Sequence, residues 1–387
     1  MLFDNIIGPH RPISWVVQFW PVLAGSFACS LAATWLCKKL ALKLNIVDRP
    51  DDLVKTHKEP IAYLGGIGIL IGLVVGVLAG VVYLRNEDFF SSALKWLLGI
   101  LAGSAIACFV GLADDILDIK PWQKLAGQTL AAFFLIITGI VPALGLISEY
   151  FFGWEMSART EMIISIPVVI FFVLGASNSL NLLDGLDGLC GGVTAIITVA
   201  MLLLAVHLAT WHASDIGDPV RIIICLSLVG GVCGFLPFNR YPAKIFMGDA
   251  GSMLLGFVVA ALMMLFWQGV PRWCLAAIVA FGLPILDTAT ALARRLINKR
   301  PLFVSDRGHI YDQMIDRGIP LKKTVMISYL LTVFYAVFGV GMGITTAIRT
   351  IYAVFIYAAL FLISALVIWK KGYLKMEGLR GAIPKRD

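Results

Sequence analysis

Repeated runs of apolar residues, each close to 20 residues long, limit this chain to folds that a membrane can hold. A helix needs about 20 apolar residues to cross the hydrocarbon core of a bilayer. Only 14% of the 387 residues are charged, whereas soluble domains carry roughly a quarter. The candidate spans are residues 15–37, 62–84, 94–113, 123–147, 162–177, 188–208, 221–237, 251–268, 273–293, 324–344 and 350–369. The sequence therefore predicts an all-α, polytopic membrane helix bundle of about 11 transmembrane helices, folded as a single domain over residues 1–387.

The basic residues predict which way the bundle faces. Lys and Arg concentrate in the cytoplasmic connections of membrane proteins. With the N-terminus outside and the C-terminus in the cytoplasm, 24 of the 31 Lys and Arg residues fall on the inner side. The inner connections are then residues 38–61, 114–122, 178–187, 238–250 and 294–323, followed by the tail after 369. We expect a multi-pass protein of the cell (inner or plasma) membrane, whose net charge of +7 needs no nucleic-acid partner.

Five polar segments share the predicted inner face. Ordinary loop sequence would be spread over both faces, but the outer connections are short or bland. The five segments are residues 47–66, 111–128, 177–192, 237–252 and 294–318. Nearly all the candidate chemistry is therefore expected at the cytoplasmic face.

Adjacent carboxylates end the third candidate span, in the sequence GLADDILD. Asp114 and Asp115 lie at the predicted membrane boundary, and Asp118 follows Asp114 by one helical turn. Burial and like charge both raise the pKa of a carboxyl group, so such residues usually mark a function, with a metal or a cation to offset the repulsion. A solvated helix end is the alternative interpretation, and it applies most to Asp118.

Asn and Asp residues recur at intervals of three in SNSLNLLDGLDG. They are Asn178, Asn181, Asp184 and Asp187. In a helix this spacing places neighbours on adjoining parts of one surface. Amide and carboxylate oxygens are hard ligands that suit Mg²⁺ bound beside a phosphate. The alternative, an Asx-rich turn that caps the next helix, explains one or two of these residues but not four.

The segment FNRYPAKIFMGDAGS places Asn239 and Asp249 ten residues apart, before the eighth candidate span. Asp249 can serve as the cap of the helix that follows. The N-terminus of the same helix would also favour a phosphate. Both interpretations of Asp249 remain open at this point.

The largest inner connection, residues 294–323, is basic and contains His309. Its cations form a phosphate-attracting surface, although Lys and Arg beside a membrane also serve as topology determinants. These cations include Arg294, Arg295, Lys299, Arg300 and Arg307. Asp287, inside the ninth candidate span, is either a functional intramembrane carboxylate or a structural group that pairs with an Arg or holds the backbone near Pro284.

Four of these motifs, in this order, resemble the polyprenyl-phosphate N-acetylhexosamine-1-phosphate transferases of glycosyltransferase family 4. They are ADDILD (113–118), NSLNLLDGLDG (178–188), FNRYPAKIFMGDAGS (238–252) and DRGHIYD (306–312). The eleven spans, the inner C-terminal tail and the arginine-rich run resemble the WecA/TagO-type branch, which starts cell-envelope polysaccharide lipids, usually from UDP-GlcNAc.

One departure from the family pattern concerns the last motif. Family members usually carry His-x-His-His there, whereas this chain has His309-Ile310-Tyr311-Asp312. The substitution argues against the muramyl-pentapeptide branch and leaves the nucleotide sugar open.

The resemblance implies a reaction and a set of roles. A UDP-N-acetylhexosamine and undecaprenyl phosphate would give undecaprenyl-diphospho-sugar and UMP. Mg²⁺, with Mn²⁺ as a substitute, would be held by Asn181 and Asp249. The implied catalytic residues are Asp114, Asp115, Asp184 and Asp187, with Asp114 slightly preferred to Asp115 as the group that deprotonates or orients the lipid phosphate. The implied substrate-binding residues are Lys55, Lys124, Asn178, Asn239, Arg300, Arg307 and His309.

Three alternatives remain beside this interpretation. They are a phospho-MurNAc-pentapeptide transferase of the same family, a lipid or sugar transporter, and a non-catalytic lipid-binding protein. A transporter predicts polar residues at mid-membrane and an internal repeat, whereas the polar residues here lie at one interface. The expected partners are undecaprenyl phosphate, a UDP-N-acetylhexosamine and the lipid bilayer. The sequence leaves the downstream polymer and the oligomeric state open, a homodimer included.

Overall fold

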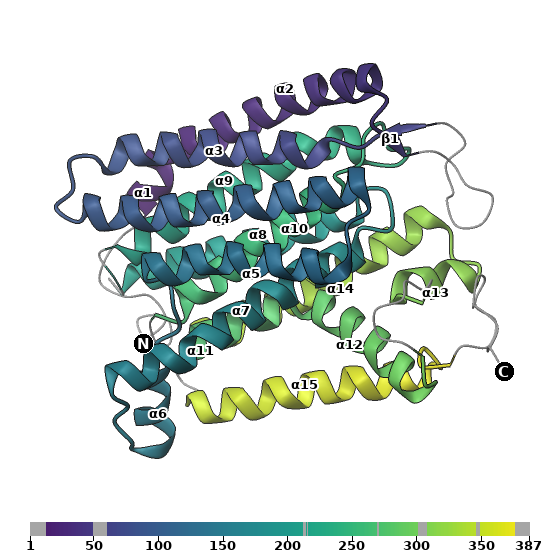
Figure 1. Ribbon diagram of the computed structural model, residues 1–387. Coiled ribbons are helices and arrows are strands. Elements are labelled where there is room, and N and C mark those ends of the chain that lie inside the picture. The colour runs from purple at the N-terminus through teal and green to yellow at the C-terminus, as the bar shows by residue number, and fades with distance from the viewer. Residues whose placement is uncertain are drawn as a thin grey trace.

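Long helices run side by side between two ends of the molecule, and a two-stranded hairpin lies at one of these ends (Figure 1). The structure is a computed structural model that describes residues 13–48, 60–211, 214, 216–268, 271–300, 308–345 and 349–375. The elements are α1 (Ile13–Gln18), α2 (Trp20–Leu44), β1 (Val47–Asp48), β2 (Ile61–Ala62), α3 (Gly65–Leu84), α4 (Phe90–Leu117), α5 (Pro121–Thr138), α6 (Leu144–Phe152), α7 (Ala158–Leu183), α8 (Leu189–Thr210), α9 (Gly217–Asn239), α10 (Gly248–Phe266), α11 (Pro271–Ala280), α12 (Gly282–Ile297), α13 (Ile310–Asp316), α14 (Leu321–Ile344) and α15 (Thr350–Lys370).

The predicted all-α membrane bundle is confirmed, with a difference in the number of spans. Within the described ranges, nine helices are long and apolar enough to cross a membrane, or ten if α11 and α12 form one broken span. These two helices meet at 67°, where one candidate span was expected over residues 273–293. The break falls just before Gly282 and Pro284. Proline lacks an N–H donor and fits best in the first turn of a helix, so Pro284 favours the start of a new helix here.

The predicted span over residues 123–147 is not among these helices, and its predicted bounds are wrong. The helix there is α5, and it ends at Gly139, which adopts a left-handed conformation with φ of 85°. Pro142 follows, and the short helix α6 begins only at Leu144. By contrast, the segment expected at 162–177 is the full-length helix α7, with 26 residues.

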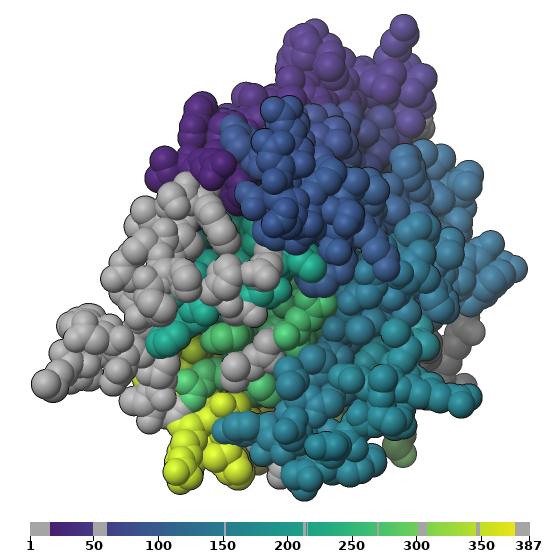
Figure 2. All heavy atoms as spheres, turned by 90° about the vertical axis from the view of Figure 1, so that its left-hand side faces the viewer, coloured from purple at the N-terminus to yellow at the C-terminus, as the bar shows by residue number. Residues whose placement is uncertain are grey.

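The hairpin lies between α2 and α3 in the sequence and contacts the loop before α10. Val47 pairs with Ala62 and Asp48 with Ile61 in an antiparallel register. Ala62 also forms a parallel bridge with Ile245, in the loop before α10. The opposite end of the bundle, viewed in Figure 2, carries the connection between α3 and α4, drawn in blue, and the region of α6 in teal. The hairpin therefore marks one end of the bundle, and the polar segments gather there.

Helix α10 forms the centre of the bundle. It packs against α3, α4 and α7, and 94% of its most apolar stretch is buried inside the protein. Helix α15 lies at the edge, with 11% of its stretch buried, and its outward Phe355 is 65% exposed. Apolar side chains on such an outer face suit contact with lipid rather than water.

Close approach of α4 to α10 depends on Gly111. A Cβ atom at this position would collide with the backbone of Asp249 and Ala250. The next turn of α4 carries Asp114 and Asp115, so this contact holds their carboxylates against the first turn of α10.

Gly111→Ala is expected to lower stability, because the two backbones must separate to admit the methyl group. Overpacking of this kind typically costs about 1–3 kcal/mol. The matched control is Gly175→Ala on α7, where no heavy atom lies within 4 Å of the added Cβ. Thermal unfolding in detergent would show a lower midpoint for Gly111→Ala alone. Equal midpoints for the two variants would contradict the close α4–α10 contact.

Candidate active site

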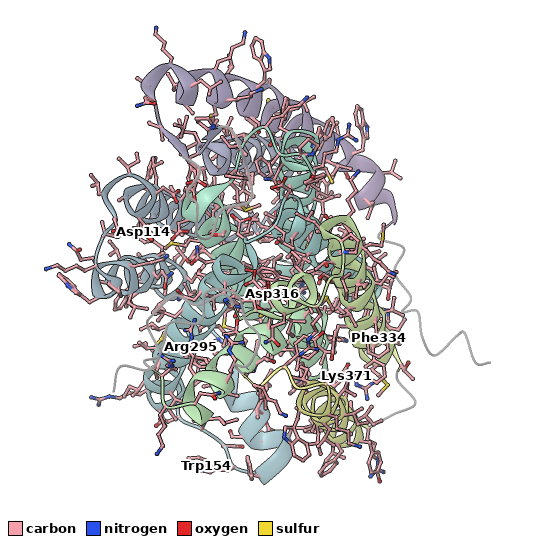
Figure 3. All side chains as sticks on the ribbon, turned by 90° about the vertical axis from the view of Figure 1, so that its right-hand side faces the viewer. Asp114, Trp154, Arg295, Asp316, Phe334 and Lys371 are labelled. Atoms are coloured by element: carbon pink, nitrogen blue, oxygen red, sulfur yellow. The ribbon has the colours of Figure 1, made fainter. Side chains whose placement is uncertain are left out.

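The polar segments meet at the hairpin end of the bundle, viewed end-on in Figure 3, which labels Asp114 on α4 and Arg295 on α12. Most of the predicted site residues lie on the last or first turns of helices rather than in loops. Helix α4 runs to Leu117 and α7 runs to Leu183. The connections predicted at 114–122 and 178–187 are therefore shorter than expected, because the helices continue beyond the apolar stretch.

One ammonium group collects oxygens from three helices. Lys124, in the first turn of α5, donates from Nζ to Oδ2 of Asp114 at 2.9 Å and to Oδ1 of Asn181 at 3.3 Å. It also forms an ion pair with Asp249. The amide Nδ2 of Asn181 donates to Oδ1 of Asp249 at 2.6 Å and to Oγ of Ser252 at 3.0 Å. We call Asp114, Asn181 and Asp249 the oxygen cluster. Residues 135 positions apart in sequence thus converge on one cation.

Asp115 has a different environment from its neighbour Asp114. Its Oδ1 accepts the backbone N–H of Asp249 at 2.8 Å, and its Oδ2 accepts the N–H of Ala250 at 3.1 Å. These two N–H groups lie in the first turn of α10 and have no partner within the helix, and the N-terminus of a helix favours negative charge. Asp115 therefore caps α10 from another helix and fixes the backbone of Asp249.

Asp184 lies just beyond α7, and its charged neighbours are carboxylates. Burial raises the pKa of Asp184 well above its ordinary value, and the charges of Asp249, Asp115 and Asp187 raise it further. Asp187 accepts the backbone N–H of Ala243 at 2.9 Å, which links its turn to the loop before α10. Within the described residues, the charges that act most on Asp184 are therefore those of other carboxylates.

The two remaining asparagines hold the framework. Nδ2 of Asn178 donates to Oε1 of Gln128 on α5 at 2.9 Å and to the Leu174 carbonyl at 2.7 Å. Asn239 is 3% exposed; its Oδ1 accepts the N–H of Gly188 and its Nδ2 donates to the Ile245 carbonyl. These contacts position backbone around the site, and direct substrate binding by either residue stays a prediction.

Asp287 holds His309. As a structural group, Asp287 was expected instead to pair with an Arg or to hold the backbone near Pro284. Nδ1 of His309 lies 2.7 Å from Oδ2 of Asp287, whose Oδ1 accepts the N–H of Ile310. Burial lowers the pKa of His309, but the carboxylates of Asp287 and Asp312 outweigh it and raise the pKa overall. The ring stacks on Tyr311, with centroids 5.5 Å apart.

Tyr311 connects this pair to the acidic site. Its hydroxyl donates to the carbonyl of Leu182 at 2.8 Å, and its ring fills the space beside Gly185. Tyr311 could not be predicted as a site residue, because an aromatic residue in a mixed segment gives no sequence signal of such a contact. Arg300 lies just beyond α12 within the described ranges, whereas Lys55 and Arg307 lie outside them.

A cavity of about 620 Å³ opens beside the oxygen cluster. Asp114, Asp115 and Asp249 form part of its wall, with Tyr63 before α3. Burial and the nearby Asp115 carboxylate raise the pKa of Tyr63, so its phenol stays neutral. The rest of the lining comes from the end of α2, the hairpin and α4: Leu44, Asn45, Ile46, Val47, Asp48, Ile116 and Asp118. The lining combines five carboxylates with the apolar side chains of Leu44, Ile46, Val47 and Ile116, which suits a ligand with a polar head and an apolar chain. Tyr63, like Tyr311, was not predicted as a site residue from the sequence.

Known proteins are similar to this chain over most of its length. Residues 97–267, which include the whole oxygen cluster, match the model of a family described as glycosyl transferase family 4. A probable undecaprenyl-phosphate N-acetylglucosaminyl 1-phosphate transferase of Bacillus subtilis (strain 168) is 29% identical over 360 residues, which cover 90% of this chain and 89% of that protein. An undecaprenyl-phosphate alpha-N-acetylglucosaminyl 1-phosphate transferase of Yersinia pestis is 28% identical over 323 residues, 81% of each chain.

A relative with a different named substrate is similar to the same degree. A phospho-N-acetylmuramoyl-pentapeptide-transferase of Shouchella clausii (strain KSM-K16) is 29% identical over 351 residues, which cover 85% of this chain and 98% of that protein. The names of these relatives therefore agree on transfer of a sugar 1-phosphate or phosphosugar, and they differ in which sugar is transferred.

Proposed function

Because this chain belongs to glycosyl transferase family 4 and is a multi-pass membrane protein, we propose that it transfers N-acetylhexosamine-1-phosphate from a UDP-sugar to undecaprenyl phosphate. The preferred sugar is GlcNAc, and the nucleotide product is UMP. The observation that carries the proposal is the oxygen cluster of Asp114, Asn181 and Asp249 beside a cavity lined by carboxylates and apolar side chains. The reaction would be the first membrane step in the synthesis of a cell-envelope polysaccharide.

The residues fit a bound Mg²⁺, with Mn²⁺ as a substitute. Asn181 and Asp249 would hold it, because their side-chain oxygens face one cation, the Lys124 ammonium, and oxygen ligands of this kind are those that Mg²⁺ prefers. Within the described ranges, no group of three His, Cys, Asp or Glu side chains forms a ready metal site, so the amide of Asn181 belongs to the proposed set. When bound, Mg²⁺ would offset the negative charge of the UDP-sugar diphosphate.

Asp114 is the group that we assign to the lipid phosphate. It lines the cavity and has Lys124 as its partner, whereas both oxygens of Asp115 are occupied by backbone N–H groups. Asp114 would accept a proton from the lipid phosphate or orient it. An oxygen of that phosphate then attacks the β-phosphorus of the UDP-sugar. The bond from this phosphorus to the bridging oxygen breaks, and UMP leaves with that oxygen.

The nucleotide sugar would lie toward α12 and α13. Asp287 fixes Nδ1 of His309, which leaves Nε2 as the nitrogen that can donate to an anionic oxygen when the ring is protonated. Lys124 would contact a phosphate on the other side, and Arg300 would supply a further cation from the described part of this region. The excess of Lys and Arg in the connections at this end predicts that it faces the cytoplasm.

Two observations bear on the sugar. The relatives from Bacillus subtilis and Yersinia pestis are named for GlcNAc, and this chain has His309 followed by Ile310 and Tyr311 in place of a histidine cluster. Both favour GlcNAc. The similarity to a phospho-N-acetylmuramoyl-pentapeptide-transferase favours UDP-MurNAc-pentapeptide as the second candidate donor.

A panel of nucleotide sugars tests the proposal. Purified protein would be incubated with undecaprenyl phosphate, Mg²⁺ and one of UDP-GlcNAc, UDP-GalNAc or UDP-MurNAc-pentapeptide, and UMP would be measured. We expect UMP release with UDP-GlcNAc that depends on the lipid phosphate. Release with UDP-MurNAc-pentapeptide alone would assign the second candidate. UMP release from none of the three would contradict the proposed function.

A further inference from the structure

Lys124 occupies the position in the oxygen cluster that a metal ion would need. Its Nζ atom contacts Oδ2 of Asp114, Oδ1 of Asn181 and Oδ2 of Asp249, which come from three helices. The Lys124 side chain is 16% exposed, so its charge is compensated by these oxygens more than by water. The other oxygen of Asp249 is held by Asn181, which leaves Oδ2 as the atom shared by the ammonium and any incoming cation.

Two cations cannot share this position at low cost. Like charges about 4 Å apart repel strongly in a partly buried environment. A divalent ion bound to Asn181 and Asp249 would lie within that distance of Lys124 as it stands. Lysine carries its charge on a flexible four-carbon stem and can move without a change in the backbone. The ammonium must therefore leave the cluster, or the metal cannot enter it.

We propose that Lys124 is a tethered counter-ion, which fills the cation position of the oxygen cluster in the metal-free protein and gives it up when a divalent cation binds. The inference rests on the metal site of the proposed function. It adds that the Lys124 ammonium and the metal ion exchange at one position. In the metal-free state the ammonium keeps Asp114 and Asp249 from repelling each other. After exchange, the ammonium is released beside the bound metal, within reach of a phosphate oxygen.

Metal affinity without substrate tests the exchange directly. Binding of Mn²⁺ would be measured from the loss of the free-ion electron paramagnetic resonance signal, for the wild type and for Lys124→Met. Removal of the competing charge is expected to tighten Mn²⁺ binding by about tenfold or more. The matched control is Lys120→Met, which removes the same charge from an exposed position four residues earlier and should bind like the wild type. Unchanged or weaker binding by Lys124→Met would overturn the proposal.

A double variant locates the bound ion. Lys124→Met with Asp249→Asn should lose the gain in affinity, because the shared carboxylate is gone. A gain that survives would place the ion elsewhere and overturn the exchange.

A second readout uses the wild-type protein and does not depend on how the variants fold. Acetylation of Lys124 by an amine-reactive reagent, followed by mass spectrometry, should become several-fold faster with Mn²⁺ because the amine loses its carboxylate partners. An equal or slower rate would contradict the exchange. Neither readout requires turnover, so a protein that shows the exchange but releases no UMP would disprove only the transferase function.

Discussion

Asp249→Asn is expected to abolish nearly all UMP release while the bundle stays folded. The substitution keeps the shape of the side chain but removes the charge that pairs with Lys124 and would hold the metal. Loss of one preorganised electrostatic partner typically lowers turnover on the order of 10²–10³-fold, and loss of a metal ligand should reach at least that range. The backbone N–H of residue 249 would still bond to Asp115, so the start of α10 should keep its place.

The measurement is UMP release by protein that elutes as a single species and melts within a few degrees of the wild type. Asp88→Asn is the matched control, because it removes a carboxylate from an exposed turn between α3 and α4, at the far end of the bundle. It should retain full activity. If Asp249→Asn kept activity within a few-fold of the wild type, the assignment of Asp249 to the metal would be wrong.

The adjacent carboxylates Asp114 and Asp115 should respond differently to the same substitution. Asp114→Asn removes the group assigned to the lipid phosphate and should lower turnover by about 10²–10⁴-fold, the range typical of a general base. Its melting temperature should change little, since Asp114 contacts a partly exposed lysine side chain. Affinity for the UDP-sugar should remain, because this residue lies on the side of the acceptor.

Asp115→Asn should lose stability as well as turnover. The carboxylate accepts two backbone N–H groups, and an amide offers only one oxygen, so one donor at the start of α10 is left without a partner. Hydrogen bonds to a charged group contribute about 1.5–3 kcal/mol each. Melting temperature, UMP release and UDP-sugar affinity, measured on both variants, separate the two roles. Equal melting temperatures, or a loss of UDP-sugar affinity without a loss of rate, would contradict these assignments.

Sequence patterns predicted the helices better than their ends. Every candidate span corresponds to helix in the structure, because each needs only a sufficient run of apolar residues. Helix ends do not follow apolarity alone. Helix α4 continues through Asp114 and Asp115 to Leu117 because backbone hydrogen bonding does not stop where the apolar side chains stop. The break between α11 and α12 depends on Gly282 and Pro284, which an average over a whole segment conceals.

The candidate site shows a similar limit. The spacing of Asn181 and Asp184 predicted that they share one helical surface, and the order of the motifs associated them with Asp249. The structure brings these three residues together. Sequence could not distinguish Asp114 from Asp115, since adjacent helical residues point about 100° apart and their partners come from other helices. The pairing of Asp287 with His309 joins residues 22 positions apart through a loop. Tyr63 and Tyr311 acquire their places from tertiary packing, which no local pattern specifies.

The most direct test of the account follows the β-phosphate of the donor. UDP-GlcNAc labelled with ³²P in the β-phosphate and ³H in the sugar would be incubated with the protein, Mg²⁺ and undecaprenyl phosphate. The account predicts both labels in the lipid fraction in equal amounts, with unlabelled UMP in water. Transfer of ³H alone, with ³²P left in UDP, would show that the sugar moves without its phosphate and would contradict phosphosugar transfer.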